Sequence, residues 1–268
     1  MTKTNQLKIA VISDVHIGSK RKKASDIITN HNNTLLQPKE NKYLDIIFIA
    51  GDLFDTLLSL QDDSVTDILL WFGELFTFCE KHDISLRVLE GTPSHDRMQS
   101  IHLVNVGKLR MSSVDFRYVK TVHIEYFPQY NINVLYVPDE WDHDPNNTLS
   151  EVKELMKAKG LQQVDLAIMH GNFEYQLPTN IKGIPRHDSA AYSELVKHYI
   201  FIGHIHTFST LGKIIAQGSF DRLSHNEEEP KGYVKAFIDL KTHEKSYFFI
   251  ENKGARIYKT ISVKNMEL

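Results

Sequence analysis

Short runs of apolar and β-branched residues alternate along the chain with longer amphipathic segments. Five of these runs have the length and apolar character of buried strands: Ile9–Ser13, Ile46–Ala50, Leu86–Leu89, Leu166–Met169 and Tyr199–Ile202. Between them, apolar residues recur at helical spacing in Asp63–His82 and Leu149–Lys159, which predicts two helices. Strands that alternate with helices predict an α/β layered fold.

Each predicted strand is followed by residues that carry chemistry. In chain order, the motifs are SDVH at 13–16, GDLFD at 51–55, EGTPSHD at 90–96, HGN at 170–172 and GHIH at 203–206. Ligands of open α/β sheets bind at the carboxyl ends of the strands, where the loops converge. A single histidine at such a position is more often a hydrogen-bonded core residue than a ligand. Five polar motifs at strand ends instead predict one shared site.

The polar side chains in these motifs are mostly carboxylates and imidazoles. Continued extension of the first strand would place Asp14 and His16 on the same side of the chain and Val15 toward the core. Donors of this kind, without a thiolate, suit Mn, Fe, Zn or Ni rather than a structural zinc or a calcium ion. The candidates exceed the needs of one ion, and two ions bridged by a carboxylate form a recurring clamp for phosphate ester hydrolysis. Asp52 is the predicted bridge, because Gly51 permits a tight strand exit before it.

Composition and charge limit the class of protein and the partners that are possible. The 268 residues are 41% hydrophobic and 24% charged, as in an ordinary globular protein, and the single cysteine, Cys79, excludes a disulfide framework and a cysteine-rich zinc site. The formal net charge of -3 gives no overall attraction to nucleic acid, so a polyanion would have to meet local positive charge or bound cations. No apolar run matches a membrane span or a signal sequence, which predicts a cytoplasmic protein without membrane contact.

The ordered set of motifs resembles that of the calcineurin-like binuclear metallophosphoesterases. DVH, GDLFD, a degenerate GNHD written here as GTPSHD, an isolated HG and GHIH follow the order of that family across residues 7–220. The resemblance implies a four-layer α/β/β/α sandwich, with two mixed sheets flanked by helices, in a single domain over residues 1–268. It also implies two divalent metal ions, with Mn²⁺ expected and Fe, Zn, Ni or Mg as alternatives.

The resemblance further implies a role for each motif residue. The implied ligands are Asp14, His16 and His206 for one metal, Asp52 as the bridge, and His170 and His204 for the second metal. His95 would protonate the leaving oxygen, and Asp96 would orient His95. Where the family has an asparagine ligand before the catalytic histidine, this chain has Ser94, which is either a weaker ligand of the second metal or a turn residue after Pro93.

One segment beyond the motifs bears on the substrate. Gly218–Val234, GSFDRLSHNEEEPKGYV, resembles the corresponding segment of the double-strand-break-repair nucleases of the SbcD type. This implies a Mn-dependent DNA exonuclease or endonuclease for repair or recombination, with C-terminal strands within 232–263 completing the second sheet. Without the resemblance, the segment is a turn with an acidic tip, Glu227–Glu229. The basic run Lys20–Lys23 either binds backbone phosphates or is an exposed loop.

Three functions stay open at this point. The first is a phosphodiesterase acting on DNA, with substrate selection by loops such as Phe127–Asp144 and Leu177–Asp188. The second is a phosphodiesterase or phosphatase for small nucleotides or phosphoproteins, which the slight net charge and the absence of a capping domain favour. The third is a non-catalytic scaffold, which only Ser94 favours. The sequence leaves open whether the chain forms a homodimer or binds an SbcC-type ATPase partner.

Overall fold

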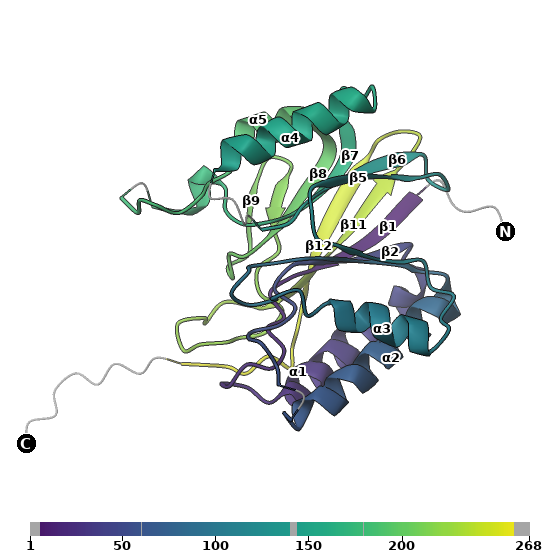
Figure 1. Cartoon of the computed structure of the whole chain (residues 1–268), viewed down its shortest axis with the longest axis vertical. Coiled ribbons are helices and arrows are strands. Elements are labelled where there is room, and N and C mark those ends of the chain that lie inside the picture. Colours follow the sequence, from purple (N-terminus) through teal and green to yellow (C-terminus); the bar gives the residue numbers. More distant parts are fainter. Residues whose placement is uncertain (1–5, 60, 140–143, 179, 260–268) are drawn as a thin grey trace, which may run out of the picture.

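Two mixed sheets stacked face to face form the centre of the molecule. The computed structural model describes residues 6–59, 61–139, 144–178 and 180–259. Within them, each sheet has six strands, and helices cover the two outer faces, so the layers follow the order helix, sheet, sheet, helix (Figure 1). The predicted α/β sandwich is therefore confirmed.

The first sheet has the order β12-β11-β1-β2-β3-β4. Its strands are β1 (Gln6–Ile12), β2 (Ile46–Ala50), β3 (Ser85–Leu89), β4 (Phe116–Val119), β11 (Gly232–Asp239) and β12 (Lys245–Glu251). Strands β1 to β4 are parallel, whereas β11 runs antiparallel to β1 and β12. The helical segments on its outer side are α1 (Ala24–His31), η1 (Asn32–Leu36), η2 (Lys39–Tyr43), α2 (Ser64–His82) and α3 (Ile101–Leu109).

The second sheet has the order β5-β6-β7-β8-β10-β9. Its strands are β5 (His123–Phe127), β6 (Ile132–Val137), β7 (Val164–His170), β8 (Val196–Gly203), β9 (Ser209–Leu211) and β10 (Ile214–Ala216). The four inner strands are parallel and both edge strands are antiparallel to their neighbours. The remaining helical segments are α4 (Pro145–Ala158), η3 (Glu174–Gln176) and α5 (Ser189–Leu195), and α4 and α5 cover this sheet (Figure 1). No helix in the described part of the chain has the length and apolar character needed to cross a bilayer.

Three apolar clusters hold the layers together. One lies between the sheets and contains Phe48 and Phe201, another lies under α1 and α2, and the third lies under α4 and α5. Fully burying side chains of this size stabilises the fold by roughly 1.5–3 kcal/mol each. The sheets therefore form a rigid support for the loops at their carboxyl ends.

The prediction that the C-terminal strands complete the second sheet was wrong. β11 pairs with β1 from Gln6↔Asp239 to Val11↔Val234, so β11 and β12 extend the first sheet instead. The physical reason is that β1 is almost fully buried, and its outer edge would otherwise leave buried backbone groups without hydrogen bonds. Residues 260–263 of the predicted segment lie outside the described residues.

Candidate metal centre

The carboxyl ends of β1, β2, β3, β7 and β8 converge on one polar cluster. The predicted residues gathered there are Asp14, His16, Asp52, His95, His170, His204 and His206. Four of them have φ in the left-handed region: Asp14 (50°), His16 (49°), Asp52 (48°) and His204 (99°). Such conformations are uncommon outside glycine and concentrate at functional sites. Tight turns therefore direct these side chains into the cluster. The expectation that β1 continues as an extended strand through His16 was wrong, because β1 ends at Ile12. Val15 is buried, as predicted.

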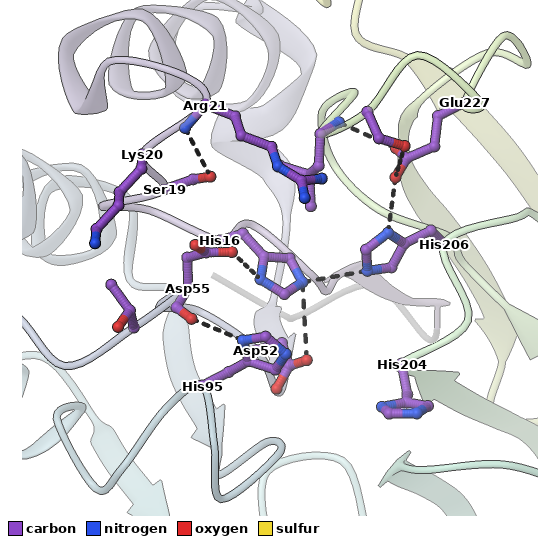
Figure 2. A pocket seen from close by; sticks show the side chains of 13 residues that line it. His16, Ser19, Lys20, Arg21, Asp52, Asp55, His95, His204, His206 and Glu227 are labelled. Atoms are coloured by element: carbon purple, nitrogen blue, oxygen red, sulfur yellow. Dashed lines mark hydrogen bonds and ion pairs between the residues drawn. The ribbon is translucent and has the colours of Figure 1, made fainter.

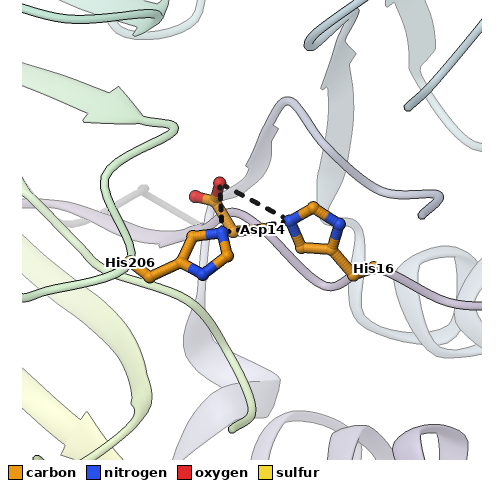
Figure 3. A group of neighbouring side chains, drawn as sticks. All are labelled: Asp14, His16 and His206. Atoms are coloured by element: carbon orange, nitrogen blue, oxygen red, sulfur yellow. Dashed lines mark hydrogen bonds and ion pairs between the residues drawn. The ribbon is translucent and has the colours of Figure 1, made fainter. Parts of the chain in front are cut away.

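Asp14, His16 and His206 form the first group of donors (Figure 3). The Nε2 atoms of the two histidines are 3.2 Å apart, and Asp14 Oδ1 lies 4.0 Å from His16 Nε2 and 3.8 Å from His206 Nε2. Both carboxylate oxygens of Asp14 also accept the backbone N–H of His204 at 3.0 Å. This link connects the carboxyl ends of β1 and β8, and therefore the two sheets.

Asp52, His170 and His204 form the second group, and Asp52 also faces the first. Its Oδ1 lies 3.3 Å from His170 Nε2, and its Oδ2 lies 3.8 Å from His16 Nε2. Burial would raise the pKa of Asp52, but the charge of His170 and a hydrogen bond from it dominate and lower that pKa. The position of Asp52 between the groups is that expected of a bridging ligand.

Two glycines make room for Asp52. Gly51 has a φ of +83°, and a Cβ there would lie 2.2 Å from His170 Nδ1. A Cβ on Gly91 would lie 2.1 Å from the backbone nitrogen of Asp52. Since real Cβ atoms do not approach other atoms so closely, only glycine permits this approach of the two strand ends.

Thr92 occupies the place that the sequence interpretation gave to Ser94. Thr92 Oγ1 lies 3.1 Å from Asp52 Oδ2, 3.2 Å from His204 Nδ1 and 3.4 Å from His170 Nε2. Ser94 is exposed in the turn after Pro93, where its backbone oxygen accepts a hydrogen bond from Arg97 Nε at 3.2 Å, so the structure favours the turn residue over the ligand. The reason is that Thr92, the first residue after Gly91, enters the cluster, while Pro93 and Ser94 lie in the turn that leads to His95.

Replacing Thr92 with valine should weaken the second group selectively. Valine has nearly the same shape but lacks the hydroxyl, while the backbone N–H of Thr92 still binds Asp52 Oδ1. We expect metal content after dialysis, measured by mass spectrometry, to fall toward half of the wild-type value. Ser94→Ala is the matched control and should keep full metal content. A loss in Ser94→Ala with none in Thr92→Val would restore the original assignment.

His95 lies at the edge of the cluster and is oriented by Asp55. The ring centroids of His16 and His95 are 4.9 Å apart, and His95 Nδ1 lies 2.7 Å from the backbone oxygen of Asp55. The Asp55 carboxylate lies 3.1 Å from His16 Nδ1, which lowers the pKa of Asp55. Asp55 therefore positions both His16, a candidate metal ligand, and His95, the candidate general acid. Asp55 was overlooked although it closes the GDLFD motif.

Asp96 does not orient His95, which corrects the second assignment in this loop. Its two carboxylate oxygens accept the backbone N–H groups of Phe54 and Gly91, each at 2.8 Å. Burial and the nearby charge of Asp52 raise the pKa of Asp96. Asp96 is thus a structural residue that fastens the loop after β3 to the loop after β2.

Glu227 connects the segment Gly218–Val234 to the cluster. Its Oε1 lies 3.0 Å from His206 Nδ1, and its Oε2 lies 3.3 Å from Lys231 Nζ. Burial would raise the pKa of Glu227, but hydrogen bonds from His206 and from the backbone N–H of Leu223, together with the charge of Lys231, lower it to about 2. A carboxylate on the second ring nitrogen fixes the orientation and tautomer of a metal-binding histidine. The acidic tip therefore contributes Glu227 to the site.

A cavity of about 570 Å³ opens over the cluster (Figure 2). Its lining residues are His16, Ser19, Lys20, Arg21, Asp52, Asp55, Thr56, His95, His204, His206, Leu223, Ser224 and Glu227. The predicted basic run divides: Lys20 and Arg21 line the cavity, whereas Lys22 is buried in an ion pair with Asp221 and the exposed Lys23 precedes α1. Of the four residues in that run, only Lys20 and Arg21 line the cavity.

The donor set fits a metal ion. Three groups of side chains in the described part of the chain could hold one: the two groups above and the set His16, Asp55 and His95, which shares His16 with the first group. All donors are imidazole nitrogens, carboxylate oxygens or, with Thr92, a hydroxyl. This chemistry suits Mn, Fe, Zn or Ni better than calcium or a thiolate-bound structural zinc.

No protein-family model matches the chain. No curated protein matches its sequence. Among solved structures, TT1561 of Thermus thermophilus is 11% identical with a TM-score of 0.47, over 91% of this chain and 99% of that one. GAP50, the anchor in the inner membrane complex of Plasmodium, is 12% identical with a TM-score of 0.43, over 95% of this chain and 91% of that one. Similarity this low carries no functional argument. The fold and the site together define an α/β sandwich with side chains at its strand ends that could hold metal ions.

Proposed function

We propose that the chain is a metal-dependent phosphodiesterase that hydrolyses DNA with two divalent ions, Mn²⁺ being the expected metal. The observation that carries this proposal is the position of Asp52 between two separate donor groups, with His95 beside them. When bound, two divalent ions would activate a water nucleophile and neutralise charge that develops on the phosphate. The family resemblance described from the sequence supports the same activity.

The contacts of His95 favour a role as general acid. Its Nδ1 faces the backbone carbonyl oxygen of Asp55, which only accepts hydrogen bonds, so Nδ1 carries a hydrogen and donates a hydrogen bond to that oxygen. The other ring nitrogen, Nε2, is then the atom that can transfer a proton to the departing sugar oxygen. Because the ring lines the cavity, a substrate phosphate over the donor groups would lie within its reach.

Two features favour a nucleic-acid substrate. Lys20 and Arg21 bring positive charge to the rim of the cavity, where phosphates on either side of the scissile bond would lie. The segment that resembles the repair nucleases contributes Glu227 to the site, which a solvated turn would not do. A phosphatase for small nucleotides or phosphoproteins is the alternative, because a cavity of about 570 Å³ is the size of a small-molecule pocket. An SbcC-type ATPase partner and a cytoplasmic location stay predictions.

One comparison of substrates tests the proposal. The Mn²⁺-loaded protein would be given linear duplex DNA, circular duplex DNA, single-stranded DNA, a cyclic nucleotide and p-nitrophenyl phosphate. Faster turnover of any of the DNA substrates than of the last two supports a nuclease, and a preference for linear over circular duplex indicates an exonuclease. Preference for the cyclic nucleotide or the phosphate monoester would indicate a phosphodiesterase or phosphatase for small substrates instead of a nuclease. No turnover of any of the five would indicate a non-catalytic binding scaffold.

The basic rim should act on DNA and not on small esters. We expect the double variant Lys20→Ala/Arg21→Ala to raise KM for DNA about tenfold and to weaken its dependence on salt, since each phosphate contact releases counterions. Turnover of bis(p-nitrophenyl) phosphate should be unchanged, because this ester has no neighbouring phosphate. Lys23→Ala, an exposed position outside the cavity, is the matched control. An equal loss on both substrates would contradict a role in binding neighbouring phosphates.

A further inference from the structure

β12 is an edge strand with little protection against pairing. It pairs with β11 over seven residues without a bulge, and no described residue pairs with its other edge. Edge strands are usually blunted by proline, bulges, inward-pointing charges or short length. β12 contains no proline, and its residues Lys245 to Phe248 are all exposed. Tyr247 and Phe248 are 37% and 56% exposed, so the edge is also apolar.

The sequence of β12, KSYFFIE, is complementary to itself in one antiparallel register. In a two-fold pairing centred on Phe248, Lys245 lies opposite Glu251 of a second copy, and Tyr247 lies opposite Phe249. Opposite charges and aromatic pairs directly across two strands both stabilise a sheet. Glu251 makes no ion pair within the described part of the chain, so its carboxylate is free to meet a lysine. Lys245 Nζ donates one hydrogen bond to the backbone oxygen of His198 in β8 and keeps two further N–H donors for a carboxylate.

We propose that two copies of this chain associate through their β12 strands, in antiparallel register about Phe248. The association joins the two six-stranded first sheets into one continuous sheet and gives an isologous dimer, in which each contact occurs twice. A single strand pair buries a small area, so the dimer is transient, with Kd in a range of about 1–100 μM. This inference does not depend on the proposed activity.

The geometry fixes where the two metal centres lie. β12 runs parallel to β1, because both strands are antiparallel to β11. The carboxyl end of β12 therefore lies at the same edge of the sheet as Asp14. Antiparallel pairing of two β12 strands places the two centres at opposite ends of the continuous sheet. Each centre works alone, and activity per chain is independent of protein concentration.

Sedimentation of the full chain across a range of protein concentrations tests the proposal. We expect a monomer–dimer equilibrium, and we expect Phe248→Lys to weaken it at least tenfold by placing two like charges at the two-fold axis. Tyr126→Lys is the matched control, because Tyr126 is 52% exposed on β5, an edge strand of the other sheet. A wild-type monomer at all concentrations, or a dimer that Tyr126→Lys disrupts and Phe248→Lys does not, would overturn the proposal.

A charge exchange tests the register. Glu251→Lys and Lys245→Glu should each weaken the dimer about tenfold, because each places like charges opposite one another twice. An equimolar mixture of the two variants should recover dimers. In a mixed dimer, both lysines of the Glu251→Lys chain lie opposite glutamates of the Lys245→Glu chain, so both cross-strand pairs again join opposite charges. Thermal unfolding of each variant checks that it is folded. A mixture of folded variants that stays as monomeric as its components would exclude this register.

Discussion

Replacing His95 with alanine is expected to lower kcat by a factor of about 10²–10⁴, the usual contribution of a positioned general acid. The imidazole is held by its Nδ1–H hydrogen bond to the Asp55 carbonyl and lines the cavity, and alanine has no group that can donate a proton there. The measurement is Mn-dependent turnover of the substrate that the comparison above identifies. Metal content after dialysis should stay at the wild-type value, because the six donors of the first two groups and Thr92 remain.

The metal content separates an acid from a ligand. His95 also belongs to the donor group with His16 and Asp55, and in that role its loss would release an ion. Lower occupancy in His95→Ala would therefore assign it to metal binding, and turnover near wild type would remove it from the mechanism. His225→Ala is the matched control, because His225 is an exposed histidine next to the cavity-lining Ser224. This variant should keep both turnover and metal.

The strands that carry the site were predictable because they are buried on both faces. Continuous apolar runs such as Ile46–Ala50 are characteristic of inner parallel strands, and β1, β2, β3, β7 and β8 contain all five predicted runs apart from Ser13, which follows β1. α2 and α4 likewise contain the predicted helices except for their flanking residues. α4 begins earlier than predicted, at Pro145, because the Asp144 side chain accepts from the N–H of Asn146 and caps it.

The peripheral elements were harder to predict. The segment Phe127–Asp144, interpreted as a substrate loop, contains β6, whose residues are nearly all buried. Pro128 and Asn131 precede this strand and are typical of loops, which hid the apolar run that follows them. The half-buried edge strand β4 has four residues, too few to establish a period. Short elements of this kind are fixed by tertiary packing rather than by local sequence.

The site residues also differ in how well the sequence predicts them, depending on whether they lie at strand ends or in loops. Asp14, Asp52, His170, His204 and His206 lie at or just after the ends of buried strands, so strand direction alone brings them to one edge. The loop after β3 is different, because its path decides whether the hydroxyl of Thr92 or that of Ser94 enters the cluster.

The same limit applies to Asp55, Asp96 and Glu227. Their partners lie on other loops, and these contacts depend on how the chain returns to the site. A sequence pattern identifies which side chains can serve as ligands, but it does not identify which residues orient them.

The free energy of unfolding should depend on pH through His31, which belongs to none of the donor groups and is fully buried. Its ring packs against Trp71 at 4.7 Å and Phe220 at 5.2 Å, and neither ring nitrogen has a hydrogen-bond partner among the described residues. Burial lowers the pKa of His31 to about 3, whereas the unfolded chain has the ordinary value of about 6.5. Between these values only the unfolded chain binds the proton, so stability is complete above about pH 6.5 and falls with decreasing pH, by about 1.4 kcal/mol per unit.

Urea unfolding at several pH values measures this dependence, and the variant His31→Phe isolates it. Phenylalanine keeps a planar ring against Trp71 and Phe220 without a titrating group, so stability near pH 7.5 should change by less than about 1.5 kcal/mol. Toward about pH 4 the variant should become the more stable protein, because it avoids the protonation of His31 on unfolding. Some slope will persist, since burial also lowers the pKa of His187 and His198 to about 4 each. The exposed His225→Phe should follow the wild-type slope, and equal slopes in His31→Phe and wild type would show that His31 does not couple folding to protonation.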